Sequence, residues 1–493
     1  MESATMSEAT LYIAILVVIL VTLLGVSIWQ SFKIRTKADF MVAGRRLAWP
    51  VLVFTLLSSW IGAGSLFAGA ENAFKNGFAS LWLPAGGWVG LIVIALIAGR
   101  ARRFAQYTVP DLLETRYNRF ARLFGTLAIV IAYTGITSYQ FRGGGDILHL
   151  IFPDQISPEQ GMYIMAAFVI TFTALAGMAS VAYLDLVIGL LVTVTACLAL
   201  PVLIEHGGGW QQVRASLPEN HFTVLGPLRW YQALNFFLPV LFLILGNQAM
   251  YQKFFSARSE RDAKIAVGGW IVGTILLETV IVALAVVGSA IFTDANPRDI
   301  IPISARSGLP ALLGALLLGG IFAKVISTGN NYLFSPAANL IHDIYHRFLR
   351  PKASEREILV LSRLIVFALG IIALVLAAHT ESILRMALYA YTVYGAAITP
   401  VVLAAFFWRR ATSAGALISI LAGTAVSIGW NLVRDFGPLG NAFVDLTHKL
   451  DAVVPALSLS LLLLVLVSFL TQPPRPEQVK PFLAGPEPET RPA

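Results

Sequence analysis

The sequence predicts an all-α membrane protein of about thirteen transmembrane helices, and three observations lead to this fold class. The 493 residues are 57% hydrophobic and only 13% charged, whereas soluble domains carry roughly 25% charged residues. Apolar runs of about 20 residues, the length that a helix needs to cross the hydrocarbon, recur along the chain. The loops between these runs are alternately rich and poor in lysine and arginine.

About thirteen segments have the length and hydrophobicity of a membrane span. They lie near residues 9–31, 50–72, 79–100, 122–142, 160–180, 182–204, 233–252, 265–292, 310–345, 358–378, 384–408, 413–433 and 452–471. The segment 310–345 is too long for one crossing, so we expect it to extend into the cytoplasm. The first run follows the acidic residues Glu2 and Glu8. Because a cleavable signal peptide starts with basic residues, this run predicts a retained helix.

Every second loop is strongly basic. The five basic loops are residues 33–46, 100–122, 252–264, 346–356 and 408–410, and together they carry 21 lysines and arginines. Such residues accumulate in cytoplasmic loops. The alternation therefore predicts an outside N-terminus, a cytoplasmic C-terminus and a multi-pass location in a bacterial inner (plasma) membrane. It also accounts for the net charge of +8. We therefore expect the chain to contact the lipid bilayer and do not expect it to bind nucleic acid.

Residues 1–471 are expected to form one transmembrane domain, with core repeats at about 50–204 and 233–408. The tail, residues 472–493, contains seven prolines and no hydrophobic pattern, which predicts a disordered cytoplasmic extension. The single cysteine, Cys197, lies in an apolar run. It excludes a disulfide framework and a thiolate metal site.

Two of the predicted spans are interrupted in comparable ways. The second contains three glycines within "GAGSLFAG" (62–69), and the seventh contains Pro239 followed by "GNQ" (246–248). Freed backbone groups at membrane depth are tolerated where they line a cavity. Five spans run from the second to the sixth and five from the seventh to the eleventh, so the two halves have opposite orientations. Broken helices at matching places in inverted halves indicate the central site of a transporter, whereas glycines alone also allow close helix packing.

Several motifs from about residue 33 to 433 carry a family resemblance. They are "SSWIGAGSLFAGAENAFKNGFASLW" (58–82), "YTVPDLLETRYN" (107–118), "GNQAMYQKFFSARSERDAK" (246–264), "STGNNYLFSPAANLIHDIY" (327–345) and "FFWRRATSAGAL" (406–417). In this order and spacing, the chain resembles the sodium:solute symporter family. The resemblance implies the leucine-transporter type of inverted five-plus-five fold, thirteen helices, alternating access, and uptake of a solute coupled to an ion gradient.

The resemblance also implies a place for the ion. In the family, sodium lies between the broken second helix and the ninth helix. The two neighbouring hydroxyls of the ninth helix match Ser327 and Thr328, and a backbone carbonyl one turn earlier falls on Lys324. The carbonyls of the second helix map to Phe54 and Leu57. Without the resemblance, the hydroxyls could equally bond back to their own helix.

Lys324 departs from the family, which usually has a small residue at this position. It shares a helix face with Ser327 and Thr328, at i+3 and i+4. One hypothesis is that its ammonium takes the place of sodium, which would make transport proton-coupled or uncoupled. The alternative is that Lys324 points into a wet cytoplasmic vestibule and that the chain is an ordinary Na⁺-coupled symporter with an intact ion site.

Asp185 matches an aspartate that the family has on the sodium exit path. It could equally serve as an N-cap or a first-turn acid at the start of its helix. The family often has a threonine before it and a glutamine three residues after it. This chain has Leu184 and Ile188 there, which weakens the case for sodium.

The resemblance places the solute between the two broken helices. Asn247 matches a polar position that often contacts substrate, and Gln248 and Tyr251 follow it. Glu71 lies just beyond the break of the second helix, and Trp60 is a candidate apolar wall.

The fourth span adds two polar candidates. Arg142 is an intramembrane arginine, and its planar fork suits a carboxylate. It could instead pair with Asp146 at i+4. Gln140 is the second candidate on this helix. The residues do not identify the solute.

Two other classes of protein are remote alternatives. An intramembrane enzyme would need a nucleophile with a base, or metal ligands, but the seven histidines lie at span ends or in loops without metal-ligand spacing across two helices. A channel would show a repeated polar filter. The sequence therefore predicts a secondary transporter and no enzyme. Its expected partners are a small-molecule solute and Na⁺ or H⁺, with no cofactor other than, in the sodium alternative, Na⁺.

Overall fold

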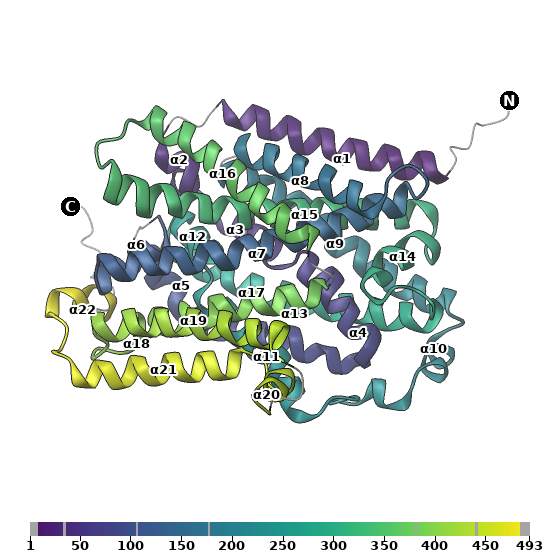
Figure 1. Ribbon diagram of the computed structural model, residues 1–493. Helices are drawn as coiled ribbons and strands as arrows, with labels where there is room; N and C mark the ends of the chain where they lie inside the picture. The colour runs from purple at the N-terminus through teal and green to yellow at the C-terminus, as the bar shows by residue number, and fades with distance from the viewer. Residues whose placement is uncertain are drawn as a thin grey trace.

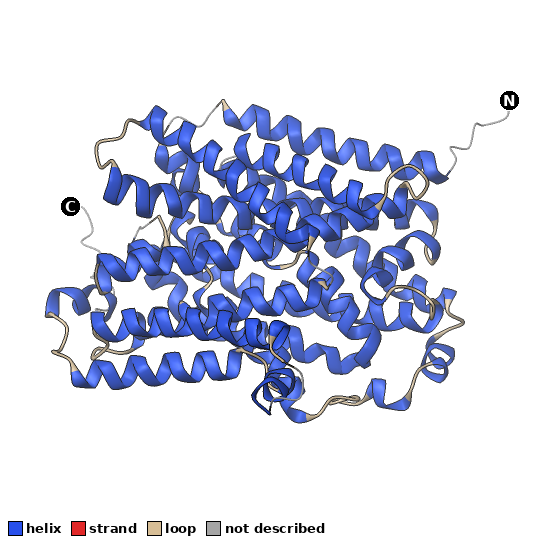
Figure 2. Cartoon of the chain, in the orientation of Figure 1, coloured by secondary structure: helices blue, strands red, loops and turns tan. Residues whose placement is uncertain are grey.

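The computed structural model describes residues 8–32, 36–104, 107–175, 178–379, 382–438 and 442–483. This part of the chain is helical and contains no β-strand (Figure 2). The helices of the first half are α1 (Glu8–Ser31), α2 (Lys37–Val42), η1 (Ala43–Arg45), α3 (Trp49–Trp60), η2 (Gly64–Gly69), α4 (Ala70–Asn76), η3 (Gly77–Leu81), α5 (Trp82–Phe104), α6 (Val109–Arg116), α7 (Arg119–Ile151), α8 (Pro158–Leu175), α9 (Met178–His206), α10 (Trp210–Ser216) and η4 (Glu219–Phe222).

The described residues of the second half are also helical. Its helices are α11 (Trp230–Gly246), α12 (Gln248–Ser256), α13 (Glu260–Ile291), η5 (Pro297–Asp299), α14 (Ile300–Ser307), α15 (Ala311–Asn339), η6 (Leu340–Leu349), α16 (Glu355–Ala378), α17 (Ile383–Ala397), α18 (Thr399–Phe407), α19 (Ser413–Phe436), α20 (Ala442–Lys449), α21 (Val453–Leu470) and α22 (Pro476–Leu483).

Ten helical stretches of the described residues are long and apolar enough to cross a membrane. Two further apolar helices, Thr10–Val26 and Trp49–Trp60, are shorter. The expected thirteen crossings and the inverted repeats stay predictions. The stretch Ala311–Leu349 is continuous over 39 residues, in agreement with the expectation that it exceeds one crossing.

The helices form an inner group and an outer group. In Figure 1, α7, α15 and α17 run through the middle of the bundle, whereas α1 and α16 lie along one edge and α21 along the other. The outer helices expose apolar side chains such as Val21, Phe367 and Phe469. Because a bilayer is apolar, these faces suit contact with lipid. The inner helices hold the buried polar side chains described below.

The tail differs from the expectation of disorder. Pro476–Leu483 form the short helix α22, and the side chain of Phe482 is 1% exposed. Its ring packs against Phe104 and Phe406, at centroid distances of 4.2 and 5.7 Å. An aromatic side chain thus docks the first part of the tail onto the bundle. Residues 484–493 lie outside the described part of the chain.

Candidate functional site

Both predicted helix interruptions are present. The helix α3 ends at Trp60, where Ile61 takes an extended conformation (φ −88°, ψ 114°) before the chain resumes as the π-helix η2. The helix α11 ends at Gly246, and Asn247 (φ −58°, ψ 110°) separates it from α12.

Side chains satisfy backbone groups that the interruptions set free. Gln140 Oε1 accepts a hydrogen bond from the backbone N–H of Ala63 (2.9 Å). Asn247 Oδ1 accepts one from the N–H of Ala249 (3.1 Å). Irregular backbone at this depth is tolerated when protein groups satisfy it in this way. One function of Gln140 and Asn247 is therefore to stabilise the breaks.

A buried group of charged and hydroxyl side chains lies beside the first interruption. We call it the Asp185 cluster; it consists of Asp185, Lys253, Lys324, Ser327 and Thr328. Lys324 has no exposed surface, and its Nζ donates a hydrogen bond to Ser58 Oγ (2.8 Å). Lys324 therefore does not point into a wet vestibule in this structure. It occupies the space between α15 and α3.

Asp185 joins this cluster from α9, so the structure places it in the interior and not at a helix cap. Its carboxylate accepts hydrogen bonds from Ser327 Oγ and from Thr55 Oγ1 (2.6 Å for Thr55). Thr328 Oγ1 lies 3.0–3.1 Å from the carbonyl oxygens of Ser58, Ile61 and Lys324. The two hydroxyls matched to the family's ion site thus face protein oxygens.

The carbonyls predicted for the ion are not those that meet Thr328. The carbonyl of Leu57 accepts a hydrogen bond from the backbone N–H of Ile61 (3.0 Å), and Phe54 faces Gly189 with its side chain. The carbonyls of Ser58 and Ile61 are the ones from α3 and the break that accept a hydrogen bond from Thr328, and ion binding by Phe54 and Leu57 stays a prediction.

Lys253 is the member of the cluster that the sequence did not reveal. We counted it among the basic loop residues 252–264, but it lies in α12 and has no exposed surface. Its Nζ donates to Asn331 Oδ1 (2.8 Å), and both Lys253 and Lys324 interact electrostatically with Asp185. The cluster thus brings two lysine side chains and one aspartate together.

A cavity adjoins the cluster, and its lining residues come from α3, η2, α5, α7, α11, α13, α15 and α17. The space inside it that a water molecule can reach is about 40 Å³, far below the roughly 300–1,000 Å³ that is usual for small-molecule sites, so the surrounding helices must move apart before an organic solute fits. Thr328 lies on its wall as well as in the cluster. A Cβ added at Gly62 would lie 2.6 Å from Thr328 Cγ2, so a glycine permits the close approach of α15 to the break.

Only some of the predicted solute residues line this cavity. Trp60 and Gln140 do. Asn247 does not line the cavity, but its Nδ2 donates a hydrogen bond to the hydroxyl of the lining residue Tyr332 (3.0 Å). Gln248 accepts a hydrogen bond from the backbone of Val109.

The other three candidates lie outside the cavity. The hydroxyl of Tyr251 donates to the carbonyl of Leu245 (3.1 Å). Glu71 pairs with Lys75 (2.7 Å). Arg142 is away from the lining, and its expected partner Asp146 pairs instead with Arg298 of η5 (3.2 Å).

Among the lining residues that the sequence analysis did not propose are the polar side chains of Ser65, Tyr139, Tyr332 and Glu278. Glu278 stands in the apolar run "ILLETVIV" (275–282). An acidic residue within a membrane span is a functional candidate by default, so this signal was available. Tyr391 also lines the cavity, and its hydroxyl lies 3.2 Å from that of Tyr139.

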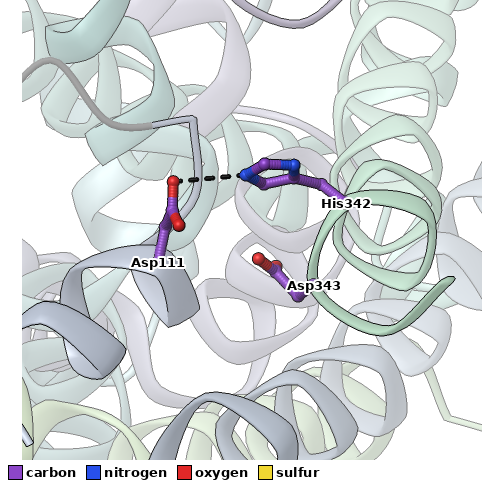
Figure 3. Close-up of side chains that lie close together, drawn as sticks. All are labelled: Asp111, His342 and Asp343. Atoms are coloured by element: carbon purple, nitrogen blue, oxygen red, sulfur yellow. Dashed lines mark hydrogen bonds and ion pairs between the residues drawn. The ribbon is translucent and has the colours of Figure 1, made fainter. Parts of the chain in front are cut away.

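A second charged group lies where α6 meets η6. Figure 3 shows that Asp111, His342 and Asp343 converge, with ligand atoms within 4.8 Å of one another, a spacing that could hold a metal ion. However, Arg122 contacts Asp111 (3.0 Å) and Asp343 (2.6 Å). Since its guanidinium supplies the positive charge, we interpret this group as an ion-pair network and not as a metal site.

Asp111 lies in the connection between α5 and α7. Burial by itself would raise its pKa, but the hydrogen bond from His342 and the charges of His342 and Arg122 outweigh burial. The pKa of Asp111 is therefore held below its ordinary value. Glu114 also belongs to the network, because it forms ion pairs with Arg122 (2.6 Å) and Arg347.

The broken helices around a central cavity define the class of protein: a secondary transporter with the leucine-transporter type of fold. Solved structures agree with this fold. A Na⁺-coupled sialic acid symporter superposes with a TM-score of 0.78 at 17% identity, covering 94% of this chain and 98% of that chain. Mhp1, a nucleobase-cation-symport-1 family transporter, superposes with a TM-score of 0.60 at 11% identity, covering 91% and 99%.

Sequence comparison identifies the family. The high-affinity proline transporter PutP of Bacillus subtilis is 28% identical over 464 residues, which cover 88% of this chain and 93% of that protein. The sodium/proline symporter of Escherichia coli is 26% identical, with 85% and 86% covered. The profile of the sodium:solute symporter family matches residues 40–423. The chain belongs to the sodium:solute symporter family and is a secondary transporter, not an enzyme.

Proposed function

We propose that this chain carries a small organic solute across the bacterial plasma membrane by alternating access, and that the ammonium of Lys324 stands in for the coupling sodium ion. Transport is then either coupled to protons or uncoupled. The observation that carries the proposal is the hydrogen bond from Lys324 Nζ to Ser58 Oγ, at a place with no exposed surface.

The charge balance of the Asp185 cluster supports this proposal. Two lysines face one carboxylate, so a bound sodium ion would add a third positive charge. A cation about 4 Å from an ammonium is repelled by about 4 kcal/mol at an effective dielectric constant of about 20. The ligand oxygens are also engaged, because the hydroxyl of Ser327 bonds to Asp185 and that of Thr328 meets three carbonyls.

The alternative is an ordinary sodium-coupled symporter. It is favoured by the hydroxyls of Ser327 and Thr328, which match the family's ion site, and by relatives that are named sodium/proline symporters. In this alternative, sodium would bind after Lys324 moves away from Ser58. Proline is the first solute to test, because several relatives are named for it.

The basic loops support the predicted orientation. The segment between η6 and α16 and the helix α22 lie at the same end of the bundle, the left-hand end in Figure 1. By the preference of basic residues for the cytoplasm, this end faces inward.

Thermal unfolding in detergent tests the ion hypothesis without any solute. A ligand that binds only the folded protein raises the unfolding midpoint. We expect no difference between sodium and potassium salts for the parent. In Lys324→Ala, which removes the ammonium and leaves space, sodium should raise the midpoint. A sodium-specific rise in the parent would overturn the proposal.

Lys324→Met is the matched control. It removes the charge but fills most of the volume of the lysine side chain, so it leaves no space for an ion. We expect no sodium response in this variant. If Lys324→Met and Lys324→Ala both respond, repulsion and not occupancy excludes sodium from the parent.

A further inference from the structure

We propose that the transported solute carries an ammonium group, protonated or quaternary, and that Glu278 binds this group in the cavity. The inference rests on the proposed transport of an organic solute through this cavity. It adds the chemical class of the solute and names the residue that selects it.

Hydrogen bonds hold the carboxyl group of Glu278 from both sides. Trp60 Nε1 donates to Oε1 (3.0 Å) and Trp88 Nε1 donates to Oε2 (2.8 Å). The hydroxyl of Ser65 lies 3.4 Å from Oε1. An indole N–H can only donate. Both oxygens of the carboxyl group therefore accept a hydrogen bond, which fixes the orientation of the group at the cavity wall.

Glu278 differs from the other buried carboxylates in having no basic partner. Among the described residues, five carboxylates are buried: Asp146, Asp185, Asp262, Glu278 and Asp343. Arginines pair with three of them, Arg298 with Asp146, Arg258 with Asp262 and Arg122 with Asp343.

The fourth, Asp185, faces two lysines. In the described part of the chain, no lysine, arginine or histidine forms an ion pair with Glu278. An uncompensated charge at this depth is costly and is retained for function. A cationic ligand would supply the missing charge.

The walls of the cavity suit the same ligand. Trp60, Tyr139 and Tyr391 line it together with Glu278. Aromatic rings attract cations through their faces, and combinations of such rings recognise quaternary ammonium groups. Of the seventeen described residues that line the cavity, none is a lysine, arginine or histidine. A purely anionic solute would therefore meet the charge of Glu278 without any compensating cation.

Binding to the purified full-length chain tests this inference with pairs of compounds of similar shape. Choline is compared with 3,3-dimethylbutan-1-ol, in which carbon replaces the charged nitrogen, and L-proline with cyclopentanecarboxylate. Glycine betaine, glucose and sialic acid complete the panel. We expect at least one ammonium compound to raise the unfolding midpoint, and its carbon analogue to have no effect at the same concentration.

Substitution of Glu278 links the response to the residue. In Glu278→Gln, the affinity for the ammonium compound should fall by about 30-fold or more, because one member of a buried charge pair is lost. Glu278→Asp keeps the charge and should retain the preference for ammonium, with weaker binding. It also keeps the test valid if Glu278→Gln does not fold. Glu159→Gln, the same change at an exposed position, should bind like the parent.

Three results would overturn the inference: no response to any ammonium compound, an equal response to the carbon analogues, or equal affinity in Glu278→Gln and the parent. None of these results affects the proposal for Lys324, whose sodium test uses no solute. Conversely, a sodium response of the parent would leave the selectivity of Glu278 standing. The two proposals therefore fail separately.

Discussion

The Asp185 cluster and the Glu278 cavity are neighbours with opposite charge balance. The cluster holds two lysines for one aspartate, and all three side chains form hydrogen bonds within the protein. The cavity holds one carboxylate and, among the described residues, no cation. Thr328 belongs to both. One site thus has basic side chains beside its carboxyl group, whereas the other has none among the described residues.

This difference suggests how transport without sodium could be driven. If the solute brings the positive charge to Glu278, the membrane potential acts on the solute itself. For a solute of net charge +1, a potential of about 100 mV, negative inside, supports about 50-fold accumulation. A built-in ammonium at the ion site and a cationic solute are therefore compatible parts of one mechanism.

The largest expected effect comes from removing the carboxylate of the cluster. Asp185→Asn leaves Lys253 and Lys324 buried without a countercharge, which should lower the free energy of unfolding by about 3–5 kcal/mol. Thermal unfolding in detergent measures it, with Asp154→Asn in an exposed loop as the control. An unchanged midpoint would mean that the two lysines are not both charged, and the contrast with the cavity would disappear.

The next change acts on the contact between the two sites. Gly62→Ala introduces a Cβ 2.6 Å from Thr328 Cγ2, and forcing a methyl group into such a contact costs about 1–3 kcal/mol. We expect reduced stability and loss of solute uptake in proteoliposomes. Gly268→Ala on α13, where nothing lies within 4 Å of the added Cβ, should behave like the parent. Full uptake by Gly62→Ala would show that the sites do not depend on this spacing.

Lys253→Met separates the roles of the two lysines. It leaves Asp185 with Lys324 alone, so the cluster becomes neutral while the ammonium beside Ser58 stays in place. We expect no sodium response, in contrast to Lys324→Ala, whose midpoint should rise by the equivalent of about 1–3 kcal/mol when sodium is at about 10–100 times its dissociation constant. A sodium response of Lys253→Met would mean that Lys253, and not Lys324, takes the place of the sodium ion.

The smallest expected change in stability concerns Asp111, which lies in the ion-pair network where acidic and basic side chains contact each other. Because its pKa lies below that of a free aspartate, about 3.9, its stabilising effect is complete above that value and is lost as the pH falls through the folded-state pKa. Asp111→Asn should cost about 1 kcal/mol at neutral pH, since the group is partly exposed. The difference from the parent should shrink in acid. A loss already between pH 7 and 5, or an equal loss in the exposed Asp445→Asn, would contradict this assignment.

The sequence was sufficient for features that depend on local patterns. Hydrophobic runs show where helices cross a bilayer, and the glycines near Gly62 and the motif at Asn247 marked both interruptions. These signals are local, because span length and backbone freedom depend on neighbouring residues. The hydroxyls of Ser327 and Thr328 and the side chains of Gln140 and Trp60 were also found, from motifs and from their positions on the helices.

The tertiary structure decided which charges meet. Lys253 stands thirteen residues after Val240 in a stretch that leads into a basic loop, and only the packing of α12 against α15 shows that it is buried. Glu278 and Trp88 are 190 positions apart, yet they share a hydrogen bond. Burial and pairing depend on contacts between distant helices, and no periodicity within one helix encodes them. The sequence by itself thus determined the fold class and the family, and the packing of the helices decided that two lysines meet Asp185 whereas Glu278 has no basic partner among the described residues.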